Sequence, residues 1–200
     1  MKQAEHRRAY HHGDLQRALL DAAMRLLGKR PDGDIGLREV ARATGVSATA
    51  VYRHFPDKDA LMAALAARGF AQLAETQRAA ASRHAHAGAA FRAIGQAYVH
   101  FAVAHPALFG LMARHMRAGH AAGAADNPAA RLLEEQVAAL AGPDADPSRL
   151  RVTALQAWAL VHGLAVLILG GQIPHDPELV AAVVDEFRPN PEEGRTRPLR

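Results

Sequence analysis

The chain has 200 residues, of which 50% are apolar and 5% aromatic, and it contains no cysteine. This length and apolar content suffice for a sizeable core, and the missing cysteines exclude disulfide bonds and thiolate chemistry. The formal net charge is +4, with 11 basic and 8 acidic residues among the first 60, a mild excess that fits either a nucleic-acid partner or a solvated charged face.

Alanine and leucine dominate the chain, and alternating β-branched runs are scarce, which predicts an all-α fold. Residues 1–12 are basic and histidine-rich without apolar periodicity, so we expect a flexible tail or an arm that reaches a neighbouring DNA groove. They lack the apolar core of a signal peptide, which favours a cytoplasmic protein. From Gly13 to Arg30, apolar residues recur at helical spacing and predict a first helix.

Residues 36–55 contain two short helical patterns separated by a glycine. Leu37, Val40 and Ala41 share one helical face, and Gly45 interrupts it. Glycine readily adopts the left-handed turn needed there, a small side chain such as that of Ala41 lets two helices cross closely, and the serine two residues after Gly45 is a good helix cap. These features predict a helix-turn-helix motif whose second helix enters the DNA major groove.

The second helix of this motif determines which side chains would face DNA. Its first turn would lie against base edges, where Thr49 would make the polar contact. Tyr52, Arg53 and His54 would lie near phosphates. Lys58, together with the amides at the start of the next helix, would hold a phosphate oxygen. The first turn has no Arg, Asn or Gln for bidentate base contacts, so Arg42, Thr44 or DNA shape would supply much of the specificity. The expected DNA-contacting residues are Arg38, Arg42, Thr44, Ser47, Ala48, Thr49, Tyr52, Arg53, His54 and Lys58.

Four blocks in a fixed order carry a family resemblance: Leu37-Arg38-Glu39-Val40-Ala41, Gly45-Val46-Ser47, Tyr52-Arg53-His54-Phe55 and Lys58-Asp59-Ala60-Leu61. Together they resemble the N-terminal DNA-binding domain of TetR-family transcriptional regulators. The resemblance implies a three-helix DNA-binding domain over residues 13–60 and a helical domain over residues 61–187 that binds a small-molecule effector and dimerises. The chain departs from the pattern at Gly36, where the family often has Ser or Thr.

Beyond the motif, the sequence predicts one long helix and several shorter ones. An amphipathic pattern runs from Asp57 to about Ala81, and a histidine-rich break at 82–88 precedes the next helical pattern. Proline is favoured at the first helical position, where its missing N–H would have no partner anyway. We therefore expect helices to start at four prolines that follow turn residues: Pro106, Pro128, Pro147 and Pro177.

The segment from Val152 to Pro174 contains no charged residue and is long enough to raise the question of a membrane span. Gln156, His162 and Gln172, three glycines and the lack of a flanking basic cluster argue against a span. We interpret the segment as a helix buried on both sides, against its own domain and against a partner. It predicts a homodimer through helices at 149–171 and 177–187 that pair as a four-helix bundle. Residues 188–200 are expected to be disordered.

The C-terminal half resembles a TetR subgroup named for a Trp-His-Gly pattern, here Trp158, His162 and Gly163. The resemblance implies an effector-sensing, dimerising domain and no particular effector. Bulky or polarizable side chains on converging helices predict a ligand pocket, although each of them fits a filled core about equally well. The pocket candidates are Phe101, Phe109, Met112, His115, Met116, Trp158 and His162.

The sequence offers little support for a metal site or for catalysis. Of the 12 histidines, no two stand at the i, i+4 spacing that places both rings on one helical face, and no catalytic or phosphate-binding fingerprint occurs. We therefore expect no catalytic residue, no cofactor and no metal. The predicted function is a ligand-responsive repressor that binds a palindromic operator. An activator, a helical binding protein or enzyme with a merely structural motif, and a membrane-associated regulator remain open alternatives.

Overall fold

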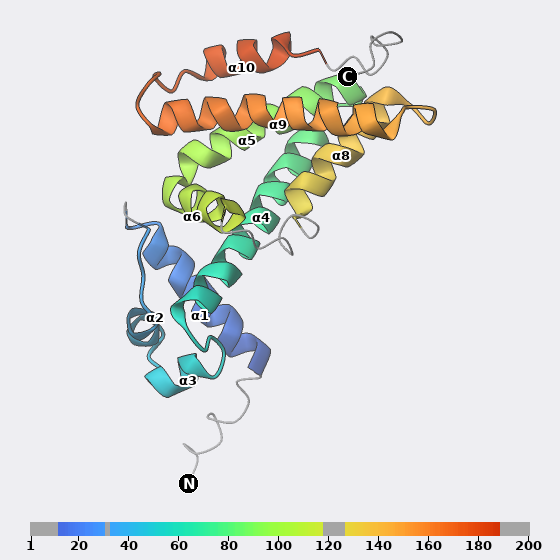
Figure 1. Cartoon of the computed structure of the whole chain (residues 1–200). Coiled ribbons are helices and arrows are strands. Elements are labelled where there is room, and N and C mark those ends of the chain that lie inside the picture. The colour runs from blue at the N-terminus through green and yellow to red at the C-terminus, as the bar shows by residue number, and fades with distance from the viewer. Residues whose placement is uncertain (1–11, 31–32, 118–126, 189–200) are drawn as a thin grey trace. The chain divides into compact units, whose positions relative to one another are not determined.

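The computed structural model describes residues 12–30, 33–117 and 127–188 (Figure 1). All regular structure within these ranges is α-helical, which confirms the predicted fold class. The predicted tails at 1–12 and 188–200 lie almost entirely outside the described residues. The described helices are α1 (His12–Leu27), α2 (Leu37–Thr44), α3 (Ala48–Tyr52), α4 (Lys58–Ala81), α5 (Ala87–Ala104), α6 (Pro106–Arg117), α8 (Pro128–Ala141), α9 (Pro147–Leu169) and α10 (Pro177–Glu186).

The chain divides into two compact units, each described here by itself. Unit 1 comprises residues 1–68 and 107–118, and unit 2 comprises residues 69–106 and 119–200. The division falls inside α4, and nearly all of α6 groups with the N-terminal helices. The domain ranges that we expect from the sequence therefore do not coincide with the compact units.

Unit 1 has one apolar core formed by its N-terminal helices and the first turns of α4. Helix α2 contacts both α1 and α3. Asp21 of α1 and Arg68 of α4 form a salt bridge. Because α2 and α3 have only 8 and 5 residues, burial of shared apolar faces rather than helix propensity holds these two helices in place. The buried side chains of this core include Leu19, Ala22, Leu27, Val40, Ala41, Val51, Phe55, Leu61 and Leu65.

Unit 2 is organised around α5, which contacts α8, α9 and α10. Figure 1 shows α10 lying alongside α9, and these two helices also contact each other. A Cβ atom on Gly95 of α5 would lie 3.0 Å from Cγ1 of Val184 on α10, so this glycine permits the close approach of the two helices. The rings of Phe91 and Phe187 stack beside it with centroids 6.1 Å apart.

The four helix starts predicted from proline are confirmed. Helices α6, α8, α9 and α10 each begin at the expected proline. In the last three, the residue before proline is an N-cap whose side chain accepts hydrogen bonds from first-turn amides. These caps supply acceptors for amides that have no partner inside the helix, which explains why short local patterns fix the helix starts. The three caps are Asn127, Asp146 and Asp176.

Helix α9 leaves much of its apolar surface exposed within the single chain. Val152 is 53% and Leu155 59% exposed near its start, and Val166 and Leu167 are exposed near its end. By length and composition α9 could cross a membrane, and among the described residues it is the one helix that meets these criteria. Its exposed face contains no charged residue after Arg151.

Candidate nucleic-acid interface

The two helices of the predicted motif, α2 and α3, meet at a left-handed glycine. Gly45 has φ 69° and ψ 23°, and the next amide, of Val46, donates to the carbonyl oxygen of Ala41 at 3.1 Å. Ser47 then starts α3, because its side-chain oxygen accepts a hydrogen bond from the amide of Ala50 at 3.2 Å. The predicted turn and cap are both confirmed, and they set the angle between the two helices.

The start of α2 differs from its end in having no side-chain cap. Gly36 stands at the cap position in an extended conformation and makes no side-chain hydrogen bond. Glu39, in the first turn, forms a salt bridge of 2.9 Å with Arg30. A carboxylate in the first turn of a helix interacts favourably with the helix dipole, so Glu39 stabilises this end in part.

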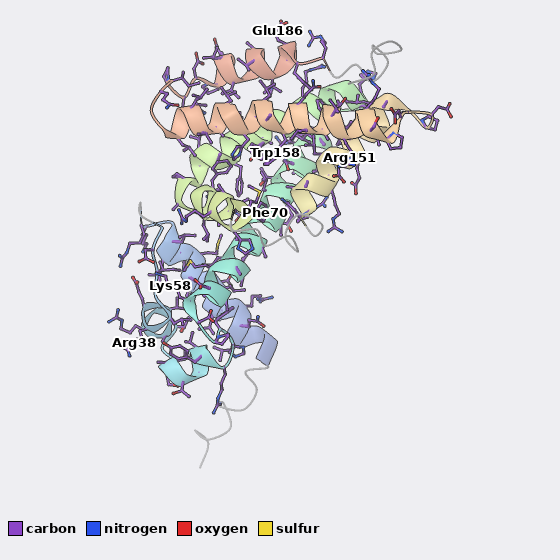
Figure 2. The ribbon with its side chains drawn as sticks, viewed as in Figure 1. Arg38, Lys58, Phe70, Arg151, Trp158 and Glu186 are labelled. Carbon is purple, nitrogen blue, oxygen red and sulfur yellow. The ribbon has the colours of Figure 1, made fainter. Side chains whose placement is uncertain are left out.

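Most of the predicted DNA-contacting side chains lie on the surface of unit 1. Tyr52 is 46% exposed. Figure 2 shows Arg38 extending outward from α2. Between residues 37 and 54, Glu39 is the single acidic residue, so the exposed face of the motif is positively charged. The exposed candidates are Arg38, Arg42, Ser47, Thr49, Tyr52, Arg53 and Lys58, and the half-buried ones are Thr44, Ala48 and His54.

Two of these candidates use their hydroxyl groups within the motif. The hydroxyl of Thr44 donates to the carbonyl oxygen of Val40 at 2.8 Å, and the side-chain oxygen of Ser47 caps α3. The proton of Thr44 and one lone pair of Ser47 are therefore engaged in the free chain. Thr49, which is exposed on the first turn of α3, is better placed to read a base.

The start of α4 is more acidic than the sequence interpretation assumes. Lys58 forms a salt bridge with Asp34 from the α1–α2 connection, and this interaction lowers the pKa of Asp34. Asp57 accepts a hydrogen bond from the amide of Ala60 at 2.7 Å, so that amide already has a partner. Asp59 adds a third carboxylate nearby in sequence. A phosphate at this helix start would have to displace Asp34 from Lys58 and would lie near three carboxylates.

The predicted pocket residues are divided between the two units. Phe101, Trp158 and His162 belong to unit 2, and the others, on α6, belong to unit 1. On α6, Phe109 and Met112 are buried, His115 is half-buried and Met116 is 36% exposed.

Unit 2 also contains a residue that the sequence interpretation missed. The hydroxyl of Tyr98 lies 2.9 Å from Nδ1 of His162, whose ring lies 5.6 Å from that of Trp158 between centroids. Burial raises the pKa of Tyr98 to about 12. The sequence pattern indicates Tyr98 as a further pocket candidate, because it lies three residues before Phe101 and hence on the same helical face.

Within the described ranges, the structure contains no group of three or more His, Asp or Glu side chains that is arranged to hold a metal ion. The histidine pairs that do meet are ring contacts, such as the one between His100 and His175, whose centroids lie 6.0 Å apart. The chemistry of the described side chains is therefore mainly that of a charged surface in unit 1 and of an aromatic, hydrogen-bonded interior in unit 2.

Comparison with known proteins shows what this combination resembles. Residues 19–65 match the family described as bacterial regulatory proteins, tetR family, and residues 91–187 match the tetracyclin repressor-like C-terminal domain. A solved structure of a protein of unknown function from Rhodococcus sp. RHA1 is 38% identical, with a TM-score of 0.74, and the alignment covers 89% of this chain and 95% of that one.

Two further solved structures have similar folds. A tetR-family transcriptional regulator from Streptomyces coelicolor is 26% identical, with a TM-score of 0.66 and coverage of 84% of this chain and 78% of that chain. The multidrug binding protein EbrR, complexed with imidazole, is 22% identical, with a TM-score of 0.56 and coverage of 84% and 92% respectively. The Trp-His-Gly subgroup stays a prediction, since the matched C-terminal family carries a different description.

Proposed function

The chain belongs to the TetR family of bacterial DNA-binding transcriptional regulators, and from this premise we propose that it is a ligand-responsive repressor that binds a palindromic operator as a homodimer. The main support for the proposal is the pair of helices α2 and α3, which is joined by a tight turn at Gly45 and has an exposed basic face. We propose further that the protein acts in the cytoplasm and has no enzymatic activity.

The DNA contacts are proposed to come from two sets of side chains. Arg38, Arg42 and Arg53 would bind phosphates, because they are exposed and long enough to reach past the motif. Thr49, with the methyl groups of the first turn of α3, would contact base edges. Two such heads in a dimer would occupy half-sites about 34 to 36 Å apart, one turn of the double helix.

The dimer is proposed to form through α9 and α10. The exposed apolar side chains of α9 would be covered by the same helix of a second copy, and Leu179 of α10, 43% exposed, would extend the interface. A Cβ atom on Gly163 would meet nothing within 4 Å in the single chain, so a partner helix could approach closely there. This arrangement accounts for the uncharged face of α9 without a membrane.

The repressor is proposed to respond to a small molecule that binds in unit 2, at the pocket candidates Phe101, Trp158 and His162. EbrR, which shares the fold, is a multidrug binding protein. Helix α4 begins at Lys58, just after the DNA-binding motif, and runs without interruption into unit 2, so it connects the DNA-binding helices covalently to the proposed effector site. An effector would need to favour one arrangement of the heads by about 1 to 3 kcal/mol to change operator affinity usefully.

The proposal is tested by selecting operator sequences from random DNA and by titrating DNA from upstream of the protein's own gene. We expect a palindromic consensus, a stoichiometry of one dimer per site and a changed consensus for Thr49→Ala. Sedimentation of Leu155→Arg should give a monomer, while Glu135→Arg, on the exposed face of α8, should stay dimeric. A monomeric wild-type protein that ignores its upstream DNA would refute the proposal.

A further inference from the structure

Unit 2 contains a buried amide oxygen for which the described residues supply no hydrogen-bond partner. Gln77 of α4 is 5% exposed; its Nε2 donates to the carbonyl oxygen of Ile94 at 3.2 Å, while its Oε1 is buried and unpaired. Exchanging the two amide atoms would place Oε1 against another carbonyl oxygen, so the bond to Ile94 fixes the orientation. Buried acceptors are nearly always paired in folded proteins, and this one therefore requires an explanation.

Through its hydrogen bond to Ile94, the amide of Gln77 lies about one helical turn along α5 from Tyr98, which forms an aromatic cluster with Trp158 and His162. The carbonyl group of Ile94 points along α5 toward Tyr98, one turn later, and helical side chains such as that of Tyr98 lean back toward the preceding turn. Ile94 also belongs to a core cluster with Ala157 of α9, directly before Trp158. Gln77 and the aromatic cluster thus come from α4, α5 and α9, and all three helices contribute residues near Ile94.

The aromatic cluster differs from Gln77 because its polar atoms have partners. The hydroxyl of Tyr98 contacts His162 and is also hydrogen-bonded by the side chain of Trp158. Trp158 is nevertheless 38% exposed in the single chain, so part of its ring is available for contact. A ring of this size offers a large apolar surface on which another aromatic group can stack.

The interior of unit 2 restricts the net charge of any molecule that binds there. Among the described residues, the buried polar side chains of Gln77 and Thr153 do not ionise, and the buried hydroxyl of Tyr98 keeps its proton at neutral pH because burial raises its pKa to about 12. Arg149, whose Nε atom is buried, lies more than two turns of α9 before Trp158. A charged molecule would lose its hydration without gaining an opposite charge, which is strongly unfavourable. The interior therefore suits an uncharged molecule.

We propose that Gln77 is an effector-binding residue and that unit 2 accepts an uncharged, largely apolar aromatic molecule with one hydroxyl or N–H group. This group donates to Oε1 of Gln77, and the aromatic part lies against Trp158. The inference rests on the proposed effector response and deepens it by naming the class of ligand. A trapped water is the competing explanation for the unpaired oxygen.

The test uses the full chain and two probes of nearly identical shape, 4-butylphenol and 4-butyltoluene. Trp158 is the single tryptophan of the chain, so its fluorescence reports binding at the proposed site. We expect the phenol to bind about two- to tenfold more tightly than the toluene, the effect of one neutral hydrogen bond. In Gln77→Leu this ratio should fall to about one, whereas Thr153→Val, which removes the other buried polar side chain, should preserve the ratio.

An unchanged ratio in Gln77→Leu, or no response of Trp158 to either probe in the wild-type protein, would overturn the inference and favour a trapped water. If Gln77→Leu does not fold, Gln77→Met replaces it, since methionine has a similar length and no hydrogen-bonding amide. DNA binding is measured on the same preparations without probe. If the wild-type protein binds DNA but does not discriminate between the probes, this inference alone is refuted, whereas absence of DNA binding by the wild-type protein refutes the proposed function.

Discussion

Replacing Lys58 by alanine is expected to flatten the salt dependence of operator binding. In the free chain the ammonium group of Lys58 forms a salt bridge with Asp34, and the two side chains are 49% and 63% exposed. Exposed ion pairs are screened by water and salt and contribute little free energy, so a DNA phosphate can displace Asp34 from Lys58 despite the carboxylates of Asp57 and Asp59 nearby in sequence. We therefore propose that Lys58 binds a DNA phosphate in the complex by exchanging Asp34 for the phosphate as its anionic partner.

The size of the effect follows from the release of counterions. Each lysine–phosphate contact changes the slope of log affinity against log salt by about 0.9. A dimer carries two copies of Lys58, so the expected change in slope is about 1.8. When the salt concentration rises fourfold, the ratio of wild-type to variant operator affinity should therefore fall about tenfold.

Fluorescence anisotropy with labelled operator DNA over a range of salt concentrations measures both slopes. Lys29→Ala is the matched control, because Lys29 is the other lysine of the described chain and lies beyond the end of α1. Asp34→Asn should raise affinity at low salt and have a much smaller effect in the Lys58→Ala background, since the two residues act through one contact. An unchanged slope for Lys58→Ala would mean that the pair with Asp34 persists on DNA, and Lys58 would leave the list of phosphate contacts.

Three further outcomes concern stability, all measured by urea unfolding. Ser47→Ala removes the cap of α3 and should lower the free energy of unfolding of unit 1 by about 1 kcal/mol. Ser47→Asn retains a capping side chain and should lower it much less, so an equal decrease in both variants would argue against the cap. Gly95→Val should destabilise by about 1 to 3 kcal/mol because its side chain meets Val184, whereas Gly88→Val on the same helix, with more room, should cost less. Because burial raises the pKa of Tyr98 to about 12, its contribution to the free energy of unfolding, about 3 kcal/mol, should be fully present below about pH 10 and should be lost as the pH rises to about 12. A Tyr98→Phe variant that loses the same stability at alkaline pH would contradict this assignment.

The sequence by itself determined the features that depend on a few neighbouring residues. The left-handed turn at Gly45, the cap at Ser47 and the helix starts at four prolines were all predictable, because each depends on backbone preferences or hydrogen bonds within one turn. The helix-turn-helix surface follows from these features, since a fixed turn and a known helical period decide which side chains face outward.

Only the tertiary structure decided which distant residues meet. Asp34 reaches Lys58 across 24 positions, and Tyr98 reaches His162 across 64. The buried, unpaired oxygen of Gln77 and the grouping of α6 with unit 1 likewise depend on how whole helices pack. Helical periodicity states which face of a helix is apolar, but not which other helix covers that face, and a polar residue on such a face acquires its partner, or lacks one, only when the helices are packed together.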